Sequence, residues 1–183
     1  MRVIAGIYRG RVLKSPPDNK TRPTSDRLRE TLFDILGPRI DEETRFLDLC
    51  AGTGAIGIEA LSRGAAFVTF VDRSKRSCAL IEENLDKLDI SEAATDIQAL
   101  AAENFTGRTH EQPWDIAYFD PPYESDYSIV LHDFGDKRDL LRDGGILIVE
   151  HHTKKQMPDA VGQLRRWRVL KQGETSLSFY ENS

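Results

Sequence analysis

Short apolar segments alternate with amphipathic segments along most of this chain, and that alternation constrains the fold more than any other feature. Strands are predicted at residues 46–50, 67–72, 94–100, 114–120 and 146–150. Helical spacing of apolar residues predicts helices at about 24–36, 55–63, 74–88 and 126–141. Strands that alternate with helices form a parallel sheet with helices on both faces. The sequence therefore predicts an α/β fold, with two last runs around 172–174 closing it as an antiparallel hairpin.

The N-terminal segment differs from the rest in charge. The chain has a formal net charge of −5, yet residues 1–29 carry +6 and residues 30–183 carry −11. Loose alternation interrupted by Gly6 and Gly10 predicts a small hairpin, so we divide the chain into a basic β-hairpin arm at 1–22 and a main domain at 23–183. A basic arm on an acidic body is suited to bind phosphate, although an arm that only keeps the chain in solution explains the charge equally well.

Composition excludes several classes of protein. A chain of 183 residues with 39% hydrophobic and 30% charged residues can build one core. No apolar run approaches the roughly 18 residues that a membrane span needs. Two cysteines, Cys50 and Cys78, make neither a disulfide framework nor a zinc cage. We expect a monomeric cytoplasmic protein that binds no metal and no membrane.

A glycine-rich turn follows the first predicted strand. Residues 52–57 (GTGAIG) match GxGxxG, and Asp72 ends the next strand twenty residues after Gly52, as in dinucleotide sites. Asp48 argues against a pyrophosphate there, because like charges repel in a cleft. A carboxylate at this position suits the cationic amine of a methionine moiety, and Asp72 can accept both hydroxyls of a ribose. The turn therefore favours S-adenosylmethionine, which carries no phosphate.

A second motif, Asp120-Pro121-Pro122-Tyr123, follows the strand that ends at Phe119. Two prolines fix the backbone and remove two N–H donors, which leaves rigid carbonyl acceptors. A carboxylate and a carbonyl can each accept one N–H of an amino group on a heterocyclic base, while the tyrosine ring stacks on that base. These four residues are the predicted catalytic group.

These motifs resemble the class I S-adenosylmethionine-dependent methyltransferases that act on amino groups. The segments at 1–13, 22–36, 46–65, 120–123 and 144–150 resemble more narrowly the bacterial enzymes that methylate N2 of a guanine in small-subunit (16S) ribosomal RNA. The resemblance covers nearly the whole chain and implies a Rossmann-like seven-stranded sheet, mostly parallel. It also implies S-adenosyl-L-methionine as cofactor, and ribosomal RNA or an assembled small ribosomal subunit as partner.

The resemblance assigns roles to individual residues. The residues expected around the methionine end are Asp48, Cys50, Ala51, Gly52 and Gly54. Asp72 is expected to hold the ribose, with Arg73 beside it. The family has an Asp-Ala pair near the adenine where this chain has Leu100-Ala101, and Asp96 and Glu103 are both candidates to replace the missing acid. The candidate substrate-binding residues are Arg9, Arg11, Arg22 and Arg27.

Two other functions remain open from sequence. The Asp-Pro-Pro-Tyr motif is shared with adenine-N6 methyltransferases of DNA or RNA, so it does not identify the base. A nicotinamide-dependent dehydrogenase would explain the glycine-rich turn but gives Asp120 and Tyr123 no role. Adjacent His151 and His152 point apart, so we expect exposed side chains rather than a shared metal ion.

Overall fold

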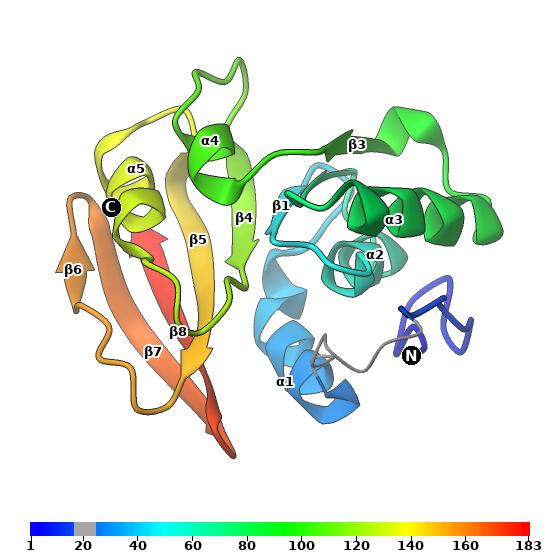
Figure 1. The fold of residues 1–183 in the computed structure, drawn as a ribbon, viewed down its shortest axis with the longest axis horizontal. Coiled ribbons are helices and arrows are strands. Elements are labelled where there is room, and N and C mark those ends of the chain that lie inside the picture. Colours follow the sequence, from blue (N-terminus) through cyan, green and yellow to red (C-terminus); the bar gives the residue numbers. More distant parts are fainter. Residues whose placement is uncertain (17–24) are drawn as a thin grey trace.

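The computed structural model describes residues 1–16 and 25–183, and Figure 1 shows one twisted sheet with helices on both faces. In chain order the elements are α1 (Asp26–Leu36), η1 (Gly37–Arg39), β1 (Arg45–Leu49), α2 (Ala55–Ser62), β2 (Phe67–Val71), α3 (Lys75–Lys87), η2 (Glu92–Ala94), β3 (Thr95–Gln98), α4 (Ala102–Thr106), β4 (Trp114–Phe119), α5 (Ser128–Asp136), β5 (Leu141–His152), β6 (Ala160–Val161), β7 (Leu164–Gln172) and β8 (Thr175–Asn182).

The sheet order is β3-β2-β1-β4-β5-β8-β7-β6. Strands β1 to β5 pair in parallel, and β8, β7 and β6 extend the sheet by antiparallel pairing. The predicted α/β fold and the C-terminal hairpin are confirmed. The strand count is eight rather than seven, because the two-residue strand β6 pairs with β7 at the sheet edge.

The strand order reverses between β1 and β4, which are neighbours although β2 and β3 intervene in sequence. Open α/β sheets bind ligands at this switch point, outside the carboxyl ends of the strands. The glycine-rich turn leaves β1 there, and the Asp-Pro-Pro-Tyr segment leaves β4. The topology thus places the two predicted motifs side by side.

Two hydrophobic clusters flank the sheet. Helices α1, α2 and α3 cover one face over Phe46, Phe70 and Ile116, whereas α4 and α5 cover the other over Leu49 and Phe119. Successive strand residues alternate between these clusters, as the two-residue period of a strand requires. We call the first the α2 face and the second the α5 face.

Helix α5 is shorter than the predicted 126–141. It ends at Asp136 because Gly135 packs tightly on the β6 turn, where a Cβ on Gly135 would lie 2.4 Å from the Val161 carbonyl oxygen. The chain then enters β5 at Leu141, five residues before the predicted strand.

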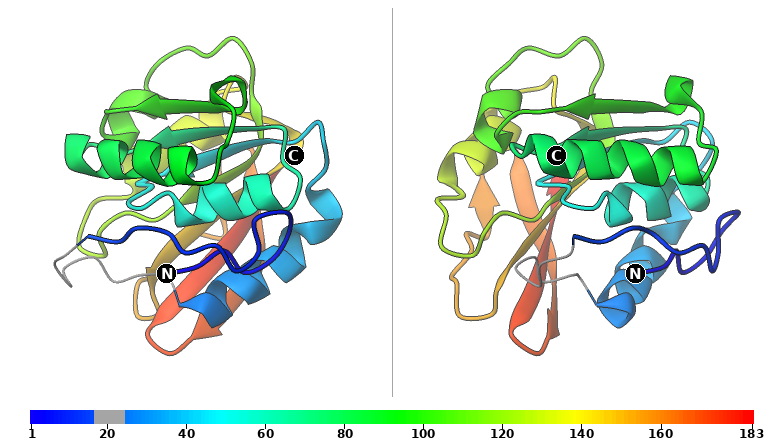
Figure 2. Two further views of the ribbon diagram at one scale, coloured as in Figure 1. Left: turned by 90° about the vertical axis from the view of Figure 1, so that its right-hand side faces the viewer. Right: turned by 45° about the vertical axis from the view of Figure 1, so that its right-hand side comes forward.

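The N-terminal segment turns back on itself, with one antiparallel bridge between Arg2 and Val12 in place of two full strands. Gly6 and Gly10 have positive φ in the connecting loop. Val3 and Leu13 are buried in the α2-face cluster. Figure 2 shows this segment lying along the helices of that face, so it is packed on the main domain rather than projecting from it.

Buried polar groups fix the N-terminal segment in place. The Glu59 side chain of α2 is fully buried and accepts the backbone N–H groups of Ile4 (2.8 Å) and Ala5 (3.0 Å). The fully buried Asn84 of α3 binds both backbone groups of Lys14. A buried carboxylate needs such donors, so α2 and this segment depend on one another. Among the described residues, no helix has the length and apolarity to cross a membrane.

Candidate active site

The glycine-rich turn connects β1 to α2 through a run of left-handed backbone. Cys50, Gly52 and Gly54 have φ of 61°, 57° and 77°. A Cβ on Gly52 would contact nothing within 4 Å, whereas one on Gly57 would lie 2.3 Å from a Phe70 ring carbon. Gly57 therefore permits the close packing of α2 on β2, and Gly52 leaves open space where a ligand can approach the backbone.

Asp48 lies at the end of β1 on the α2 face and is 2% exposed. Its carboxylate accepts the N–H of Gly57 at 2.9 Å, in the first turn of α2. Burial and, to a smaller extent, the charge of nearby Asp72 raise the pKa of Asp48 to about 8, against the lowering effect of that hydrogen bond. A cation brought to this carboxylate stabilises its charged form, which fits the predicted contact with the amine of a methionine moiety.

Asp72 follows β2 and is half-buried beside the turn. One carboxylate oxygen accepts the N–H of Gly52 at 2.9 Å, and the other accepts the N–H of Ser74 at 2.8 Å. A carboxylate offers about four lone-pair sites, so this side chain is oriented by the backbone and keeps acceptor capacity for two ribose hydroxyls. Arg73 lies next to it and is exposed.

Cys50 and Ala51 form the start of the turn. Ala51 donates its N–H to the Val71 carbonyl at 3.1 Å, which ties the turn to β2. Burial, followed by the charges of Asp120 and Asp72, raises the pKa of the Cys50 thiol far above its usual value. The thiol is therefore neutral, and thiolates rather than thiols act as nucleophiles.

The segment after β3 contains the predicted adenine end of the cofactor site. Leu100 packs partly buried against the α5-face cluster, and Ala101 is the N-cap of α4. Asp96 accepts hydrogen bonds from the Gln98 amide group through both carboxylate oxygens and lines a cavity together with Phe67 and Trp114. Glu103 is exposed in the first turn of α4, close enough to Cys50 to raise the pKa of its thiol. Of the two candidate acids, Glu103 is thus the one beside the turn.

Asp120 continues the ladder beyond β4 by donating its N–H to the Leu49 carbonyl at 3.2 Å. This bond fixes its side chain directly beside the turn that leaves β1. Burial, then the charges of Glu150 and Asp48, raises the pKa of Asp120 well above its ordinary value.

The prolines are held differently from the prediction. Pro121 is buried and Pro122 exposed. The carbonyl of Pro122 accepts both the N–H (2.9 Å) and the hydroxyl (2.6 Å) of Ser125. The Pro122 carbonyl oxygen is therefore used within the loop. The backbone carbonyls of Asp120 and Pro121 are left for the predicted role of a rigid acceptor.

Tyr123 is half-buried and is held by the strands that follow it in sequence. Its hydroxyl lies 2.9 Å from Thr175 Oγ1 of β8, and its ring meets the His152 ring edge-on at 5.7 Å and 82°. Lys155 fixes the same loop from outside, through a 3.3 Å bond to the Ser125 carbonyl and a 3.9 Å contact with the Tyr127 ring. The Tyr123 ring, which the sequence predicts to stack on the base, is therefore held in one orientation by these contacts.

Structure adds two residues that sequence analysis had not assigned. The Tyr118 hydroxyl donates to Glu150 Oε2 at 2.5 Å, and both side chains are buried. Glu150 is the last residue of the run 146–150, at the same edge of the sheet as Asp120. An acid at the end of a predicted strand is the sequence signal that could have identified Glu150. The expectation of exposed histidines was wrong, because His151 is buried and His152 is half-buried. The His151 ring is buried and contacts Ser178 Oγ at 2.9 Å, because β8 covers its strand.

Among the described residues, the predicted substrate-binding arginines lie on the N-terminal segment and on α1. Arg9 is exposed on the N-terminal loop, and Arg27 is exposed in the first turn of α1. Arg11 donates to the Lys87 carbonyl at 3.0 Å, which connects it to α3. Arg22 lies outside the described residues. Across residues 1–16 and 25–183, no group of three or more His, Cys, Asp or Glu side chains is arranged to hold a metal ion.

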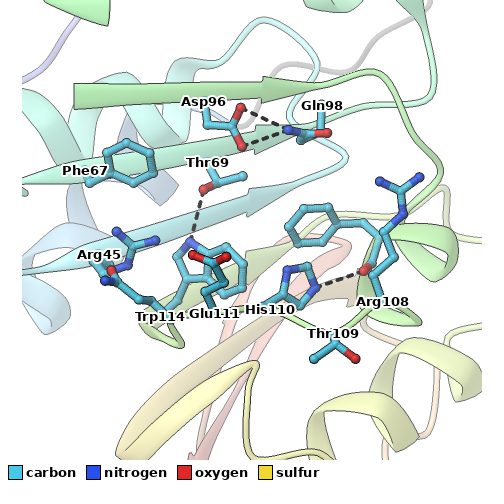
Figure 3. Close-up of a pocket in the computed structure, with 12 residues that line it drawn as sticks. Arg45, Phe67, Thr69, Asp96, Gln98, Arg108, Thr109, His110, Glu111 and Trp114 are labelled. Carbon is cyan, nitrogen blue, oxygen red and sulfur yellow. Dashed lines mark hydrogen bonds between the residues drawn. The ribbon is translucent and has the colours of Figure 1, made fainter. Parts of the chain in front are cut away.

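A cavity of about 480 Å³ lies elsewhere, on the α5 face. Figure 3 shows it between Arg45, Phe67 and Trp114, which begin three neighbouring strands, and the loop that carries His110. Trp114 donates to Thr69 across its floor at 3.1 Å. Of the residues considered for the predicted site, Asp96 lines this cavity, whereas Asp48, Asp72 and Asp120 do not.

Comparison with known proteins agrees with this geometry. The family described as "Conserved hypothetical protein 95" matches residues 1–181. Ribosomal RNA small subunit methyltransferase D of Haemophilus influenzae is 32% identical, covering 98% of this chain and 91% of that protein. The Escherichia coli K12 protein of the same name is 30% identical, covering 99% and 89%.

A solved structure of a hypothetical protein from Thermus thermophilus has a TM-score of 0.83 and 28% identity, covering 98% of each chain. The full-length match to the family and the identity to its named members lead to one assignment. This chain belongs to the Conserved hypothetical protein 95 family, together with the ribosomal RNA small subunit methyltransferases D.

Proposed function

We propose that this protein transfers a methyl group from S-adenosyl-L-methionine to the exocyclic N2 of a guanine in small-subunit (16S) ribosomal RNA. Membership of the family supports the coarser statement, an S-adenosylmethionine-dependent methyltransferase that acts on ribosomal RNA. The observation that carries the proposal is the placement of Asp120 beside the glycine-rich turn, at the switch point between β1 and β4.

The residues of the turn fit the cofactor. Open space over Gly52 admits a ligand to the backbone, and Asp72 is held where it can accept ribose hydroxyls. Asp48 offers a carboxylate to the amine. Arg73, Leu100, Ala101 and Glu103 would border the ribose and adenine.

When bound, S-adenosylmethionine supplies an electrophilic methyl group. The nitrogen of an exocyclic amine is a weak nucleophile, because its lone pair is delocalised into the ring. Asp120 accepts one N–H of that amine, which returns electron density to the nitrogen and holds it toward the methyl group. As the N–C bond forms, the sulfonium S–CH₃ bond would break, with S-adenosylhomocysteine as the leaving group, and the nitrogen must lose a proton. Asp120, with its raised pKa, is suited to take it.

Tyr123 and the RNA geometry complete the assignment. A guanine inside a helix cannot reach Asp120, so the enzyme takes a loop nucleotide or flips the base from its stack. The ring of Tyr123, held by its contact with Thr175, then stacks on the base. Such stacking contributes about 1–3 kcal/mol to the binding free energy. Arg9, Arg11, Arg22 and Arg27 would contact RNA phosphates. The Asp-Pro-Pro-Tyr group by itself binds an amino group on either guanine or adenine, so the preference for guanine rests on the family.

The test is transfer of labelled methyl from S-adenosylmethionine to small ribosomal subunits from cells that lack this protein. Nucleoside digestion of the product identifies the base, and naked 16S RNA in parallel shows whether an assembled particle is required. N2-methylguanosine is the expected product. N6-methyladenosine as the sole product would instead support the adenine-N6 alternative.

A further inference from the structure

Glu150 stands next to Asp120 on the same face of the sheet. In the β4–β5 register Tyr118 pairs with Ile148 and Phe119 with Val149, so the next pair is Asp120 with Glu150. Alternation of side chains puts Tyr118, Asp120 and Glu150 on the α2 face. The Tyr118–Glu150 hydrogen bond and the effect of the Glu150 charge on the pKa of Asp120 agree with this placement.

The Glu150 carboxylate is held in a defined orientation. It is 6% exposed, and the Tyr118 hydroxyl donates to its Oε2 at 2.5 Å. Burial and the neighbouring Glu150 charge raise the pKa of Tyr118 well above its ordinary value, so the phenol keeps its proton and stays a donor. A carboxylate offers about four lone-pair sites, and the Tyr118 bond uses one of them on Oε2 while it orients the side chain beside Asp120.

Two carboxylates on adjacent strand ends favour a ligand that brings two adjacent donors. Guanine has such an edge, because the N2 amino group and the N1–H are neighbours on its ring. Adenine presents its N6 amino group beside an N1 that carries a lone pair. That lone pair would face a carboxylate, and a buried polar group left without its partner is costly.

Building on the proposed function, we propose that Glu150 is the residue that selects guanine: it accepts the guanine N1–H while Asp120 accepts the N2–H. Tyr118 is a positioning residue that orients Glu150. Sites built to hydrogen-bond a substrate group reject analogues that lack it by large factors, on the order of 10⁴ where the group is fully enclosed. At this partly open edge we expect at least about a hundredfold discrimination.

2-Aminopurine tests the assignment, because it keeps the amino group at C2 but has a lone pair at N1. The target nucleotide is first mapped by the N2-methylguanosine that the wild-type enzyme forms. Small subunits are then reconstituted with 16S RNA that carries either guanosine or 2-aminopurine riboside at that position. The readout is the ratio of the two kcat/KM values.

We expect the wild-type enzyme to favour guanosine by at least about a hundredfold. Glu150→Gln offers an amide N–H₂ to the N1 lone pair, so it should slow transfer to guanosine, speed transfer to 2-aminopurine, and shift the ratio by about tenfold or more. 2-Aminopurine also lacks O6, so the shift between enzymes, rather than the wild-type ratio alone, identifies Glu150. Glu124→Gln, the same change at an exposed glutamate in the loop between β4 and α5, is the matched control and should leave the ratio unchanged.

Tyr118→Phe removes only the hydroxyl that orients Glu150, and it serves if Glu150→Gln does not fold. It should reduce discrimination by a smaller factor while the calorimetric affinity for S-adenosylmethionine stays near normal. An unchanged ratio in the folded Glu150→Gln protein, or in Tyr118→Phe if that protein alone folds, overturns the role of Glu150 and leaves N2 methylation standing. A product methylated only on adenine overturns the proposed function itself.

Discussion

Carboxylates on the two sides of the β1–β4 switch point are held in opposite ways. On the turn side, Asp48 and Asp72 accept backbone N–H groups from their own turn and the helices beside it. On the transfer side, Asp120 and Glu150 stand together, and burial followed by the charge of Glu150 raises the pKa of Asp120. Backbone N–H groups orient the carboxylates of the turn side, whereas on the transfer side the Tyr118 hydroxyl orients Glu150.

This difference matters for catalysis. A group already satisfied in the free protein positions a ligand with little rearrangement, which suits binding. A group whose charged form is disfavoured gains most when the reaction supplies a donor or a proton, which suits transition-state stabilisation. Substitutions on the turn side should therefore change cofactor affinity, and substitutions on the transfer side should change the rate.

The largest expected effect is that of Asp120→Ala. We expect kcat to fall about 10²–10³-fold, as when one preorganised polar group is removed from a reacting centre. Cofactor affinity should stay near normal, because Asp120 belongs to the transfer side. Single-turnover kinetics on small subunits and calorimetry with S-adenosylmethionine measure the two. Asp120→Asn keeps one acceptor but cannot take the proton, so its rate should lie between those of the wild type and Asp120→Ala. Near-normal turnover of Asp120→Ala would contradict this mechanism.

Asp72→Ala should produce the opposite pattern. It removes the acceptor for ribose hydroxyls and also frees the N–H groups of Gly52 and Ser74. Cofactor binding should weaken by about 1.5–3 kcal/mol, the range for hydrogen bonds to a charged group. Calorimetry with S-adenosylmethionine measures it. Asp72→Asn, which keeps one of the two oxygens, should lose less, and unchanged affinity in both variants would remove Asp72 from the cofactor site.

Asp48 should make stability depend on pH. Burial raises its pKa to about 8, above the value of about 3.9 in an unfolded chain, so the folded state binds more protons between these values. The free energy of unfolding should therefore fall as pH rises, by about 1.4 kcal/mol per pH unit between about pH 5 and 7 from this group. Urea unfolding of wild type and Asp48→Asn measures the difference. Parallel pH profiles of the two proteins would contradict the raised pKa.

Sequence predicted best those features that a few neighbouring residues determine. The turn at 52–57 and the ends of α2 and α3 depend on local glycines and on the Ser74 cap, and both helices lie within a residue of their predicted bounds. Asp48, Asp72 and Asp120 converge because parallel strands end at one edge, which the alternation alone implies.

The missed features depend on contacts between distant segments. Glu150 gains its place from the register of β5 on β4, and His151 is buried only because β8 covers it. The apolar pattern of α2 does not predict that the Glu59 side chain is buried. Its hydrogen-bond partners, Ile4 and Ala5, are more than 50 residues away in the sequence. Charge indicated the basic N-terminal segment, but the pattern of its residues could not show that α2 and α3 bind its backbone.

The smallest expected effect is the contribution of the N-terminal segment to RNA affinity. Because α2 and α3 bind the backbone of this segment, its side chains must be tested without deleting it. Deleting residues 1–14 would remove Val3 and Leu13 from the core and would uncover the buried Glu59, so weaker RNA binding would then report unfolding. Point changes at Arg9 and Arg27, both exposed, avoid this. Each RNA phosphate that a variant no longer neutralises should reduce the slope of log affinity against log salt by about 0.7–0.9.

The variants Arg9→Ala and Arg27→Ala should thus bind 16S RNA with a shallower salt dependence and bind the cofactor normally. Arg108→Ala, an exposed arginine beside the cavity on the α5 face, is the control and should keep the wild-type slope. Filter binding across a range of salt concentrations measures all three. If Arg9→Ala and Arg27→Ala also keep that slope, the phosphates are bound by another surface. The basic side chains at 154–168 are then the next candidates, because the rest of the body is acidic.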